Sequence, residues 1–285
     1  MKKNKIKTPF QKKVEKLMAN RLSLFGLILV AIITFVCIAA PLFTHYDATE
    51  INYGAILQMP SAEHIMGTDK LGRDVFARVL YGGRTSIYIG LVASLAGAGL
   101  GLVMGAFAGY WGGWVDALFT RLSEIIQTFP NMILILIISA VAGQGVNNLI
   151  VIFAITGWMT PFRMVRNQFL TLREETYVEV ARSFGLSDLR IIFNHILPNA
   201  LSPLMVTATT NVAGYILSEA GLSFIGVGIP IQIPTWGSIL NAAKSIDVVT
   251  DYWWLWLFPG IVLSLFVLAI NFLGDGLRDA FDPKQ

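Results

Sequence analysis

The sequence predicts an all-α integral membrane protein with six transmembrane helices, and three observations support this fold class. The chain of 285 residues is 55% hydrophobic and only 14% charged, and its mean hydropathy is +0.64. Its apolar residues gather in long runs, and about 20 apolar residues are enough to span a bilayer as a helix. Its cations lie mostly on one side of these runs, which is typical of membrane proteins.

Six apolar runs are the expected spans. The first, over residues 24–43, follows a lysine-rich start but is too long for the apolar part of a cleaved signal, so we expect it to be retained. The remaining spans are expected over residues 86–111, 128–143, 148–162, 200–218 and 254–273.

The distribution of Lys and Arg predicts that both termini are cytosolic. With the N-terminus inside, sixteen of the 21 cations lie in inner segments and five in outer ones, and cations resist translocation. The expected segments are an N-terminal cytosolic segment over 1–22, a first helix over 23–43, an extracytoplasmic loop over 44–84, a transmembrane domain over 85–275 and a cytosolic tail over 276–285.

Cysteine and histidine usage indicates neither a disulfide framework nor a metal site. Cys37 is the single cysteine and lies inside the first span. The three histidines are scattered, without the spacing of a metal motif. We expect His45 and His64, on the outer loop, to be solvated.

The second span carries a glycine every fourth residue: Gly97, Gly101, Gly105 and Gly109. This spacing places the glycines on nearly one face of a helix. In lipid, a face of small residues lets two helix backbones approach closely. We therefore expect a packing seam here, although membrane helices are rich in glycine in general.

A charged, amphipathic stretch, "YVEVARSFGLSDLRIIFNHILPN" over residues 177–199, interrupts the apolar sequence. Its pattern predicts a helix, a turn at Gly185 and a second helix with Leu189, Ile192, Phe193 and Ile196 on one face. Gly185 suits the left-handed conformation that ends a helix, and Ser187 and Asp188 suit the cap of the next one. Such a cytosolic hairpin is expected to dock on a partner, to pack under its own spans or to lie at the lipid interface.

This stretch resembles the "EAA" loop of ABC importer permeases. Glu179, Val180 and Ala181 match its opening, Gly185 its glycine, and residues 196–198 its closing Ile-Leu-Pro. Val180 replaces the first alanine of that pattern, and the closing triplet is somewhat shifted. The resemblance implies a coupling loop over 163–198 that contacts ATPase subunits through Glu179, Val180, Ala181, Arg182, Gly185, Leu186, Ser187 and Asp188.

Three further motifs extend the resemblance over most of the chain. The segments at 64–87, 217–240 and 257–283 are similar to those of dipeptide, oligopeptide and nickel permeases, of the short-loop type. The resemblance implies the type I ABC importer transmembrane fold in a bacterial cell membrane. It also implies a second related permease, two ATPase subunits that carry ATP and Mg, and an extracytoplasmic solute-binding protein. Peptides are the leading solute, and nickel, a metal–chelator complex or glutathione are alternatives.

Two rival classes have less support from the residues. An intramembrane protease would need a "GxSG" motif or a pair of mid-span aspartates, but the chain has no "GxSG" and Asp275 has no second mid-span aspartate to share a proton with. The chain also has no "GxxxxGK[ST]" phosphate loop, so we expect no enzyme. An ion-coupled carrier would need ionisable groups near the midplane, and the apolar spans offer none there.

Polar residues within the spans are candidates for the translocation path. Polar side chains inside a membrane usually face protein or a water-filled cavity. The candidates are Asn131, Thr207, Thr210, Asn211, Ser218 and Asn271. Hydrogen bonding between helices, without contact to solute, is the alternative role.

Overall fold

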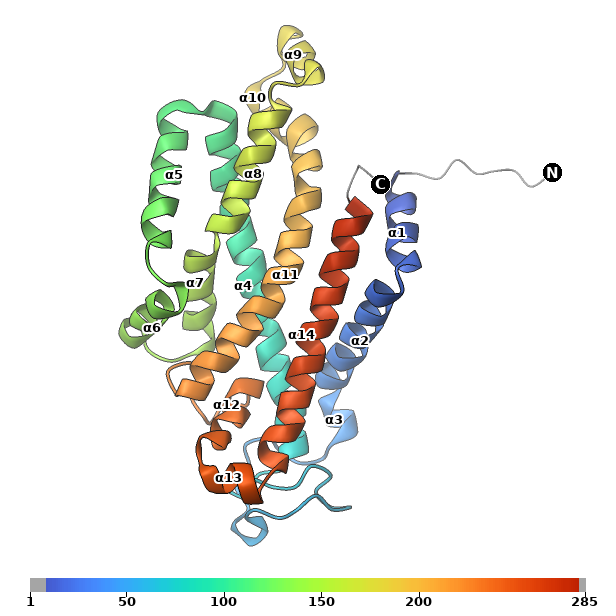
Figure 1. Cartoon of the computed structure of the whole chain (residues 1–285), viewed down its shortest axis with the longest axis vertical. Coiled ribbons are helices and arrows are strands. Elements are labelled where there is room, and N and C mark those ends of the chain that lie inside the picture. The colour runs from blue at the N-terminus through green and yellow to red at the C-terminus, as the bar shows by residue number, and fades with distance from the viewer. Residues whose placement is uncertain (1–8, 282–285) are drawn as a thin grey trace, which may run out of the picture.

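The computed structural model describes residues 9–281. Residues 1–8 of the expected N-terminal segment and 282–285 of the expected tail lie outside the described residues. The described chain is a bundle of long helices, shown in Figure 1. Within residues 9–281, four helices are long and apolar enough to cross a membrane, and there are up to six spans if each of two bent helix pairs counts as one. This count agrees with the six spans expected.

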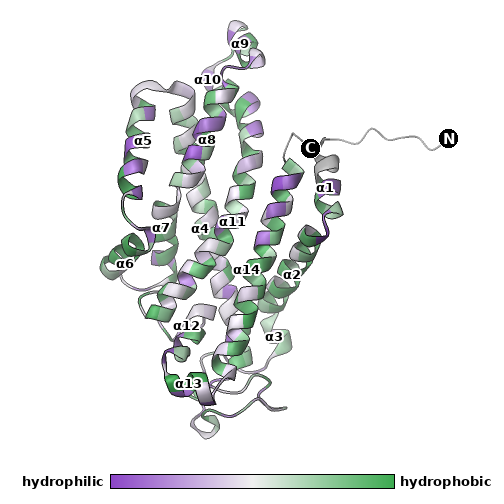
Figure 2. Ribbon diagram, in the orientation of Figure 1, coloured by the Kyte–Doolittle hydropathy of each residue, from purple (hydrophilic) through white to green (hydrophobic). Residues whose placement is uncertain are grey.

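The N-terminal part runs along one side of the bundle. It comprises α1 (Pro9–Ala19), α2 (Arg21–Ile38) and the short α3 (Ala40–Phe43). The Asn20 side chain caps α2 by accepting hydrogen bonds from two backbone N–H groups. Figure 2 shows hydrophobic residues along most of α2. This helix packs on the last helix, α14 (Trp254–Phe281).

The central helix, α4 (Val75–Trp111), begins well before the expected start at residue 86. The Asp74 carboxylate caps it by accepting the Ala77 N–H at 2.7 Å. Arg78 and Arg84 interrupt the apolar run in these first turns, which hides the helix in hydropathy. Arg84 donates to the carbonyls at the end of α2, including Cys37 at 2.7 Å, where a cation is favourable. The loop that was expected to be extracytoplasmic, which we call the outer loop, therefore ends at Asp74.

Two bent pairs follow α4. The first is α5 (Gly113–Gln127) and α6 (Asn131–Ala142), which meet at 89°. The second is α7 (Val146–Gly157) and α8 (Met159–Leu172), which meet at 40°. Helix α4 packs against both α7 and α8. The expected third and fourth spans cover only part of these pairs, because α5 and the end of α8 are amphipathic.

The remaining elements form a hairpin, a long span and an outer segment. The hairpin is α9 (Thr176–Ser183) and α10 (Asp188–Ile191), which continues through a π-turn (Ile192–Ile196) into α11 (Leu197–Ile225). The outer segment holds α12 (Trp236–Leu240), η3 (Asn241–Lys244) and α13 (Ile246–Asp251). A short turn, η1 (Tyr53–Ala55), lies in the outer loop.

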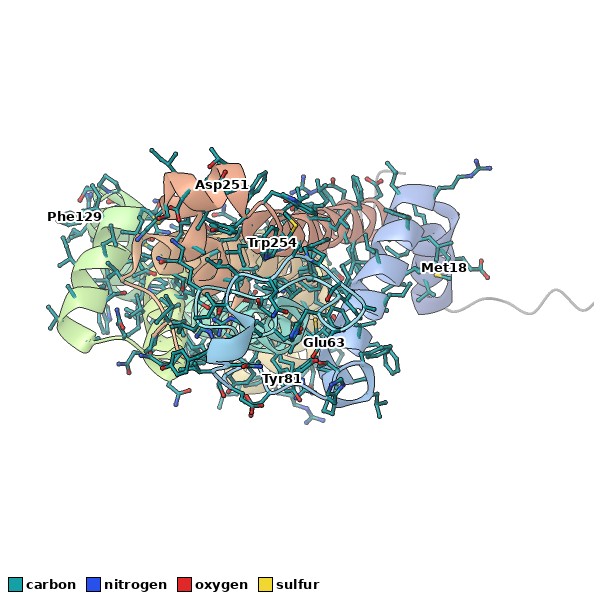
Figure 3. The ribbon with its side chains drawn as sticks, turned by 90° about the horizontal axis from the view of Figure 1, so that it is seen from below. Met18, Glu63, Tyr81, Phe129, Asp251 and Trp254 are labelled. Carbon is teal, nitrogen blue, oxygen red and sulfur yellow. The ribbon has the colours of Figure 1, made fainter. Side chains whose placement is uncertain are left out.

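The two ends of the bundle carry different segments. The hairpin, α1 and the end of α14 lie at one end, and α12, α13 and the loop before α4 lie at the other (Figure 1). Figure 3 views the molecule from this second end, with Glu63, Asp251 and Trp254 labelled. The hairpin and both ends of the described chain thus share one side, as expected from the cation distribution.

The expectation that His64 is a solvated histidine is wrong. Its side chain is buried, and its Nδ1 lies 2.8 Å from an Asp74 carboxylate oxygen. Asp74 is itself fixed at the start of α4, so the loop folds back and the ring packs on Tyr46. His45 is exposed, as expected. The contact of His64 with Asp74 anchors the outer loop on the bundle.

Candidate functional site

A polar cleft of about 570 Å³ opens between the bent helix pairs and α11. The elbow at Pro130, where α5 and α6 meet at 89°, forms one wall. The junction of α7 and α8 and one face of α11 form the others. The polar residues that line it are Gln127, Asn131, Thr156, Thr160, Asn211, Tyr215 and Ser218. No described residue that lines this cleft carries a charge.

The structure brings together three of the six path candidates. Asn131, Asn211 and Ser218 line the cleft from two different helices. Asn211 and Ser218 share one face of α11 because they are seven residues apart, whereas Asn131 reaches the cleft from α6 through the fold.

The other three candidates lie outside the cleft. The Thr207 hydroxyl is buried and lies 3.2 Å from both Met164 Sδ and the Pro203 carbonyl, either of which can accept its proton. Thr210 donates to carbonyls of its own helix and faces α14. Asn271 is exposed on α14. Threonine hydroxyls in helices are readily satisfied by the backbone one turn earlier, so a polar residue in a span need not face the path.

The cleft also contains Tyr215, which the sequence analysis did not single out. Its ring stacks on Phe153, with centroids 5.1 Å apart. Its hydroxyl occupies the space that a side chain at Gly157 would fill. The sequence could have indicated a contact between Gly157 and Tyr215, because a glycine leaves room for a facing aromatic ring. That inference would have required knowing that their two helices are neighbours.

The glycine face of α4 lies against α7 and α8. A Cβ at Gly101 would come within 2.7 Å of the Phe162 N atom, and one at Gly105 within 2.7 Å of the Phe162 carbonyl oxygen. Gly109 meets the Arg166 carbonyl in the same way, and Gly97 makes ordinary contact near Gly157. The seam therefore holds α8, one wall of the cleft, directly on the central helix.

The hairpin at residues 176–191 is a helix, a turn and a helix, as the pattern predicts, and α9 is the outermost element at its end of the bundle (Figure 1). Gly185 has φ +74°, which suits glycine. The expectation that Ser187 caps α10 with its side chain is wrong, since the hydroxyl makes no capping bond. The Asp188 carboxylate instead accepts a hydrogen bond from the Tyr110 hydroxyl at 2.6 Å, which ties the hairpin to the end of α4.

The apolar residues of the hairpin divide between two surfaces. Val178, Ala181, Ile191, Ile192 and Ile196 are buried against the ends of α8 and α11. Only 5% of Ala181, one of the expected coupling residues, is exposed, because it packs on the chain's own helices.

The other apolar side chains of the hairpin face outward: Tyr177, Val180, Phe184, Leu189 and Phe193. Phe184 is 83% exposed and stands beside the Gly185 turn. The charged side chains of Glu179, Arg182 and Asp188 are exposed around them. The hairpin thus packs under its own spans, as one of the expected roles requires, and also presents an apolar surface. Phe184 was not among the expected coupling residues.

Glu219 is a second buried feature that sequence reasoning did not use. It follows Ser218 on α11 and is 0% exposed. Its carboxylate oxygens lie 3.0 Å from the Ser86 hydroxyl and 2.7 Å from the Ser223 hydroxyl. It therefore joins α4 to the outer end of α11, directly beside the cleft.

Two models of known protein families match most of the chain. Residues 101–285 match the family model of the binding-protein-dependent transport system inner membrane component. Residues 8–60 match the N-terminal transmembrane domain of oligopeptide transport permease C. Together the two matches cover the first span, the cleft and the hairpin.

Relatives and a solved structure agree with these matches. The chain is 40% identical over 276 residues to a putative peptide permease of Brucella suis, covering 97% of this chain and 91% of the relative. It is 39% identical over 278 residues to the dipeptide transport system permease DppC of Alkalihalophilus pseudofirmus, covering 98% and 91%. Its fold is similar to an inward-facing MetNI methionine ABC transporter chain, with TM-score 0.57 and 20% identity, covering 71% of this chain and 96% of that one. This chain therefore belongs to the family of binding-protein-dependent transport system inner membrane components, and it has the type I ABC importer transmembrane fold.

Proposed function

We propose that this chain forms half of the translocation path of an ATP-driven peptide importer. Two surfaces of the chain support the proposal. The polar cleft gives a path, and the exposed apolar hairpin gives a docking surface on the same side as both ends of the described chain. The observation that carries the proposal is the cleft, because it is open, polar and walled by bent helices.

The composition of the cleft favours peptides over nickel. Its amides and hydroxyls can both donate and accept hydrogen bonds, which matches the amide groups of a peptide backbone. No described residue lining the cleft is His, Cys, Asp or Glu, and imidazole is the side chain that suits nickel. The relatives named as peptide and dipeptide permeases point to the same solute class.

The family of the chain supports a division of labour between several subunits. A second, related permease supplies the other half of the path, and two ATPase subunits bind ATP and Mg below the hairpins. A solute-binding protein delivers the peptide at the outer end. Because α10 and α11 form one continuous helical segment over Asp188–Ile225, movement of the hairpin is carried directly to Asn211 and Ser218 in the cleft wall.

The test is peptide uptake by the assembled importer in proteoliposomes, with dialanine as the probe. Asn211→Trp fills the cleft, so we expect it to reduce uptake at least roughly tenfold, as expected when a bulky group blocks a path lined by polar groups. Asn271→Trp is the matched control, because this asparagine is exposed on α14 outside the cleft. Its uptake is expected to stay within about twofold of the unmodified importer.

Both variants must still bind their permease partner and hydrolyse ATP. Equal uptake by the two variants would show that the cleft is not part of the translocation path. Uptake of nickel or glutathione in preference to dialanine by the unmodified importer would overturn the proposed solute class.

A further inference from the structure

A second pocket, which we call the outer pocket, lies at the end of the bundle opposite the hairpin. It encloses about 410 Å³ between the loop before α4, the first turn of α4 and the segment from α12 to Ser245. Its polar lining includes Asp69, Lys70, Arg73, Arg78, Ser238 and Lys244. It shares no lining residue with the polar cleft. The outer pocket is therefore separate from the proposed path.

The outer pocket gathers four of the five cations expected on the outer side. Lys70 is already paired, since its Nζ lies 3.0 Å from an Asp247 carboxylate oxygen. Hydrogen bonds from Ser245 and Lys70 hold the pKa of Asp247 below its usual value, so this pair is formed at neutral pH. The charge of Lys70 is thus compensated within the chain.

Arg73 and Arg78, in contrast, share one carboxylate. The Arg73 Nε lies 2.7 Å and the Arg78 Nε 3.7 Å from the same Asp69 oxygen. Arg78 is only 1% exposed, and its other contacts are to the carbonyls of Ala48 and Ile231. Two guanidinium groups beside one carboxylate leave a positive charge without a counter-charge. A charge in such a sheltered place is costly unless an anion accompanies it.

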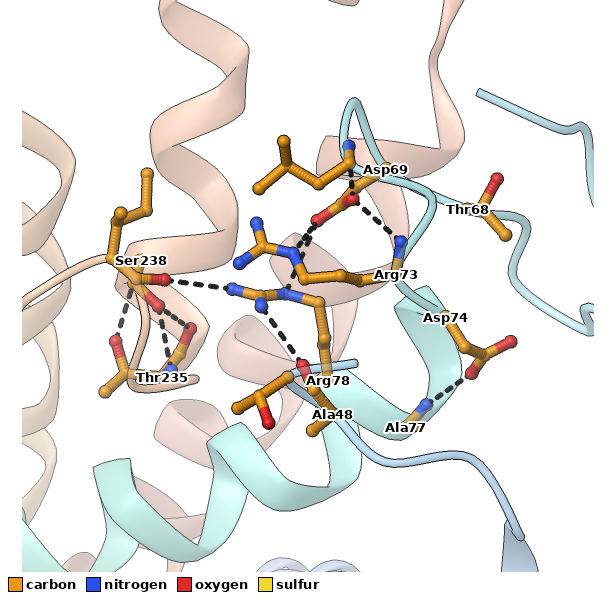
Figure 4. A network of polar contacts seen from close by, with 12 residues as sticks. Ala48, Thr68, Asp69, Arg73, Asp74, Ala77, Arg78, Thr235 and Ser238 are labelled. Atoms are coloured by element: carbon orange, nitrogen blue, oxygen red, sulfur yellow. Dashed lines mark hydrogen bonds and ion pairs between the residues drawn. The ribbon is translucent and has the colours of Figure 1, made fainter. Parts of the chain in front are cut away.

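The guanidinium of Arg73 is placed to bind that anion. Figure 4 shows Nε of Arg73 bonded to Asp69, while its two terminal nitrogens have no partner among the described residues. The side chain is only 11% exposed, so these N–H groups lie in the pocket wall rather than in open water. A guanidinium edge with two free nitrogens fits the two oxygens of a carboxylate.

We propose that the outer pocket receives an acidic side chain of the extracytoplasmic solute-binding protein, whose carboxylate binds the free edge of Arg73. The inference rests on the proposed function, because that function places the binding protein at this end. A protein carboxylate is favoured over that of a peptide solute. The pocket is built from the outer loop, the start of α4 and the outer segment, and none of its residues lines the cleft.

The experiment measures how the cognate solute-binding protein stimulates ATP hydrolysis by the importer in nanodiscs. Arg73→Gln removes both the positive charge and the guanidinium edge that would bind the carboxylate. We therefore expect the concentration of binding protein that gives half-maximal stimulation to rise at least roughly tenfold. The matched control is Asn147→Asp, which makes the same change of net charge at an exposed position at the start of α7, outside the outer pocket. We expect its half-maximal concentration to change less than about twofold.

A second variant separates contact from misfolding. Arg73→Lys keeps a cation beside Asp69 but loses the bidentate edge, so we expect an intermediate rise with intact basal ATP hydrolysis. The proposal is overturned if Arg73→Gln and Asn147→Asp behave alike. It is also overturned if peptide uptake falls at an unchanged half-maximal concentration, since that result would assign the pocket to the solute. An unmodified importer that the binding protein does not stimulate would instead contradict the proposed function.

Discussion

Glu219 connects three parts of the outer end through two serine hydroxyls. The Ser86 hydroxyl accepts the Trp236 N–H at 3.2 Å, and the Ser223 hydroxyl accepts the Ile229 N–H at 3.2 Å. Each hydroxyl has a single proton, and each directs it to a different oxygen of Glu219. The carboxylate is therefore the acceptor that fixes the segment between α11 and α12 on α4.

Glu219→Gln should destabilise the chain because an amide offers one acceptor oxygen in place of two. One serine hydroxyl then loses its buried acceptor, at a cost of about 1–3 kcal/mol. Thermal unfolding of the purified chain in detergent measures the effect. Glu124→Gln is the control, because Glu124 lies in an exposed pair with Arg121, which contributes about 0–1 kcal/mol. An unchanged unfolding temperature for Glu219→Gln would show that Glu219 does not need two acceptor oxygens.

At the scale of helices, local sequence patterns predicted where most spans lie but not where they bend. The Gly185 turn and the two hairpin helices followed from an amphipathic pattern over a few residues. The start of α5 was missed because Asp116, Arg121 and Glu124 break its apolar run. In the structure the Asp116 carboxylate is paired with Arg166 of α8, a partner 50 residues away that no local pattern reveals.

The candidate path residues also show that a local pattern does not reveal which helices lie next to a given side chain. Spacing along α11 placed Thr207 and Asn211 on nearly one face, one turn apart. The neighbours of each turn differ, since α8 covers Thr207 through Met164 whereas Asn211 lies where α7 and α8 bend away. The sequence also could not predict which face of the hairpin is exposed, because that depends on which face packs against the ends of α8 and α11.

The glycine seam gives a prediction at this scale. Gly101→Ala places a Cβ within 2.7 Å of the α8 backbone, so α4 and α8 must separate and the cleft wall moves. We expect a loss of about 1–3 kcal/mol in stability together with reduced uptake. Gly99→Ala is the control on the same helix, because a Cβ there meets nothing within 4 Å. It should be neutral or slightly stabilising, since alanine favours a helix over glycine. Equal unfolding temperatures would contradict the seam.

At the scale of the whole molecule, the outer and inner surfaces are linked by single long helices. Helix α11 runs from the hairpin past Asn211 and Ser218 to Glu219, and Glu219 holds α4 and the outer segment. The outer segment in turn forms one wall of the outer pocket. A displacement of the hairpin therefore has a continuous packed route to the cleft and to the outer end, as coupling between distant sites requires.

Phe184 is the residue at which this route is expected to begin. Its ring is 83% exposed at the outermost turn of the hairpin, and exposed aromatic side chains that enter a partner's pocket commonly contribute 2 kcal/mol or more to binding. We expect Phe184→Ala to weaken binding of the ATPase subunits roughly thirtyfold and to abolish uptake, while the chain keeps its own stability because most of the ring is exposed. Ile246→Ala is the matched control, since Ile246 is 81% exposed but lies on α13 at the opposite end. Binding of purified ATPase subunits to the permease pair in nanodiscs measures both variants. Unaltered ATPase binding in Phe184→Ala would mean that the apolar surface of the hairpin faces lipid, and coupling would then have to enter the chain through another element.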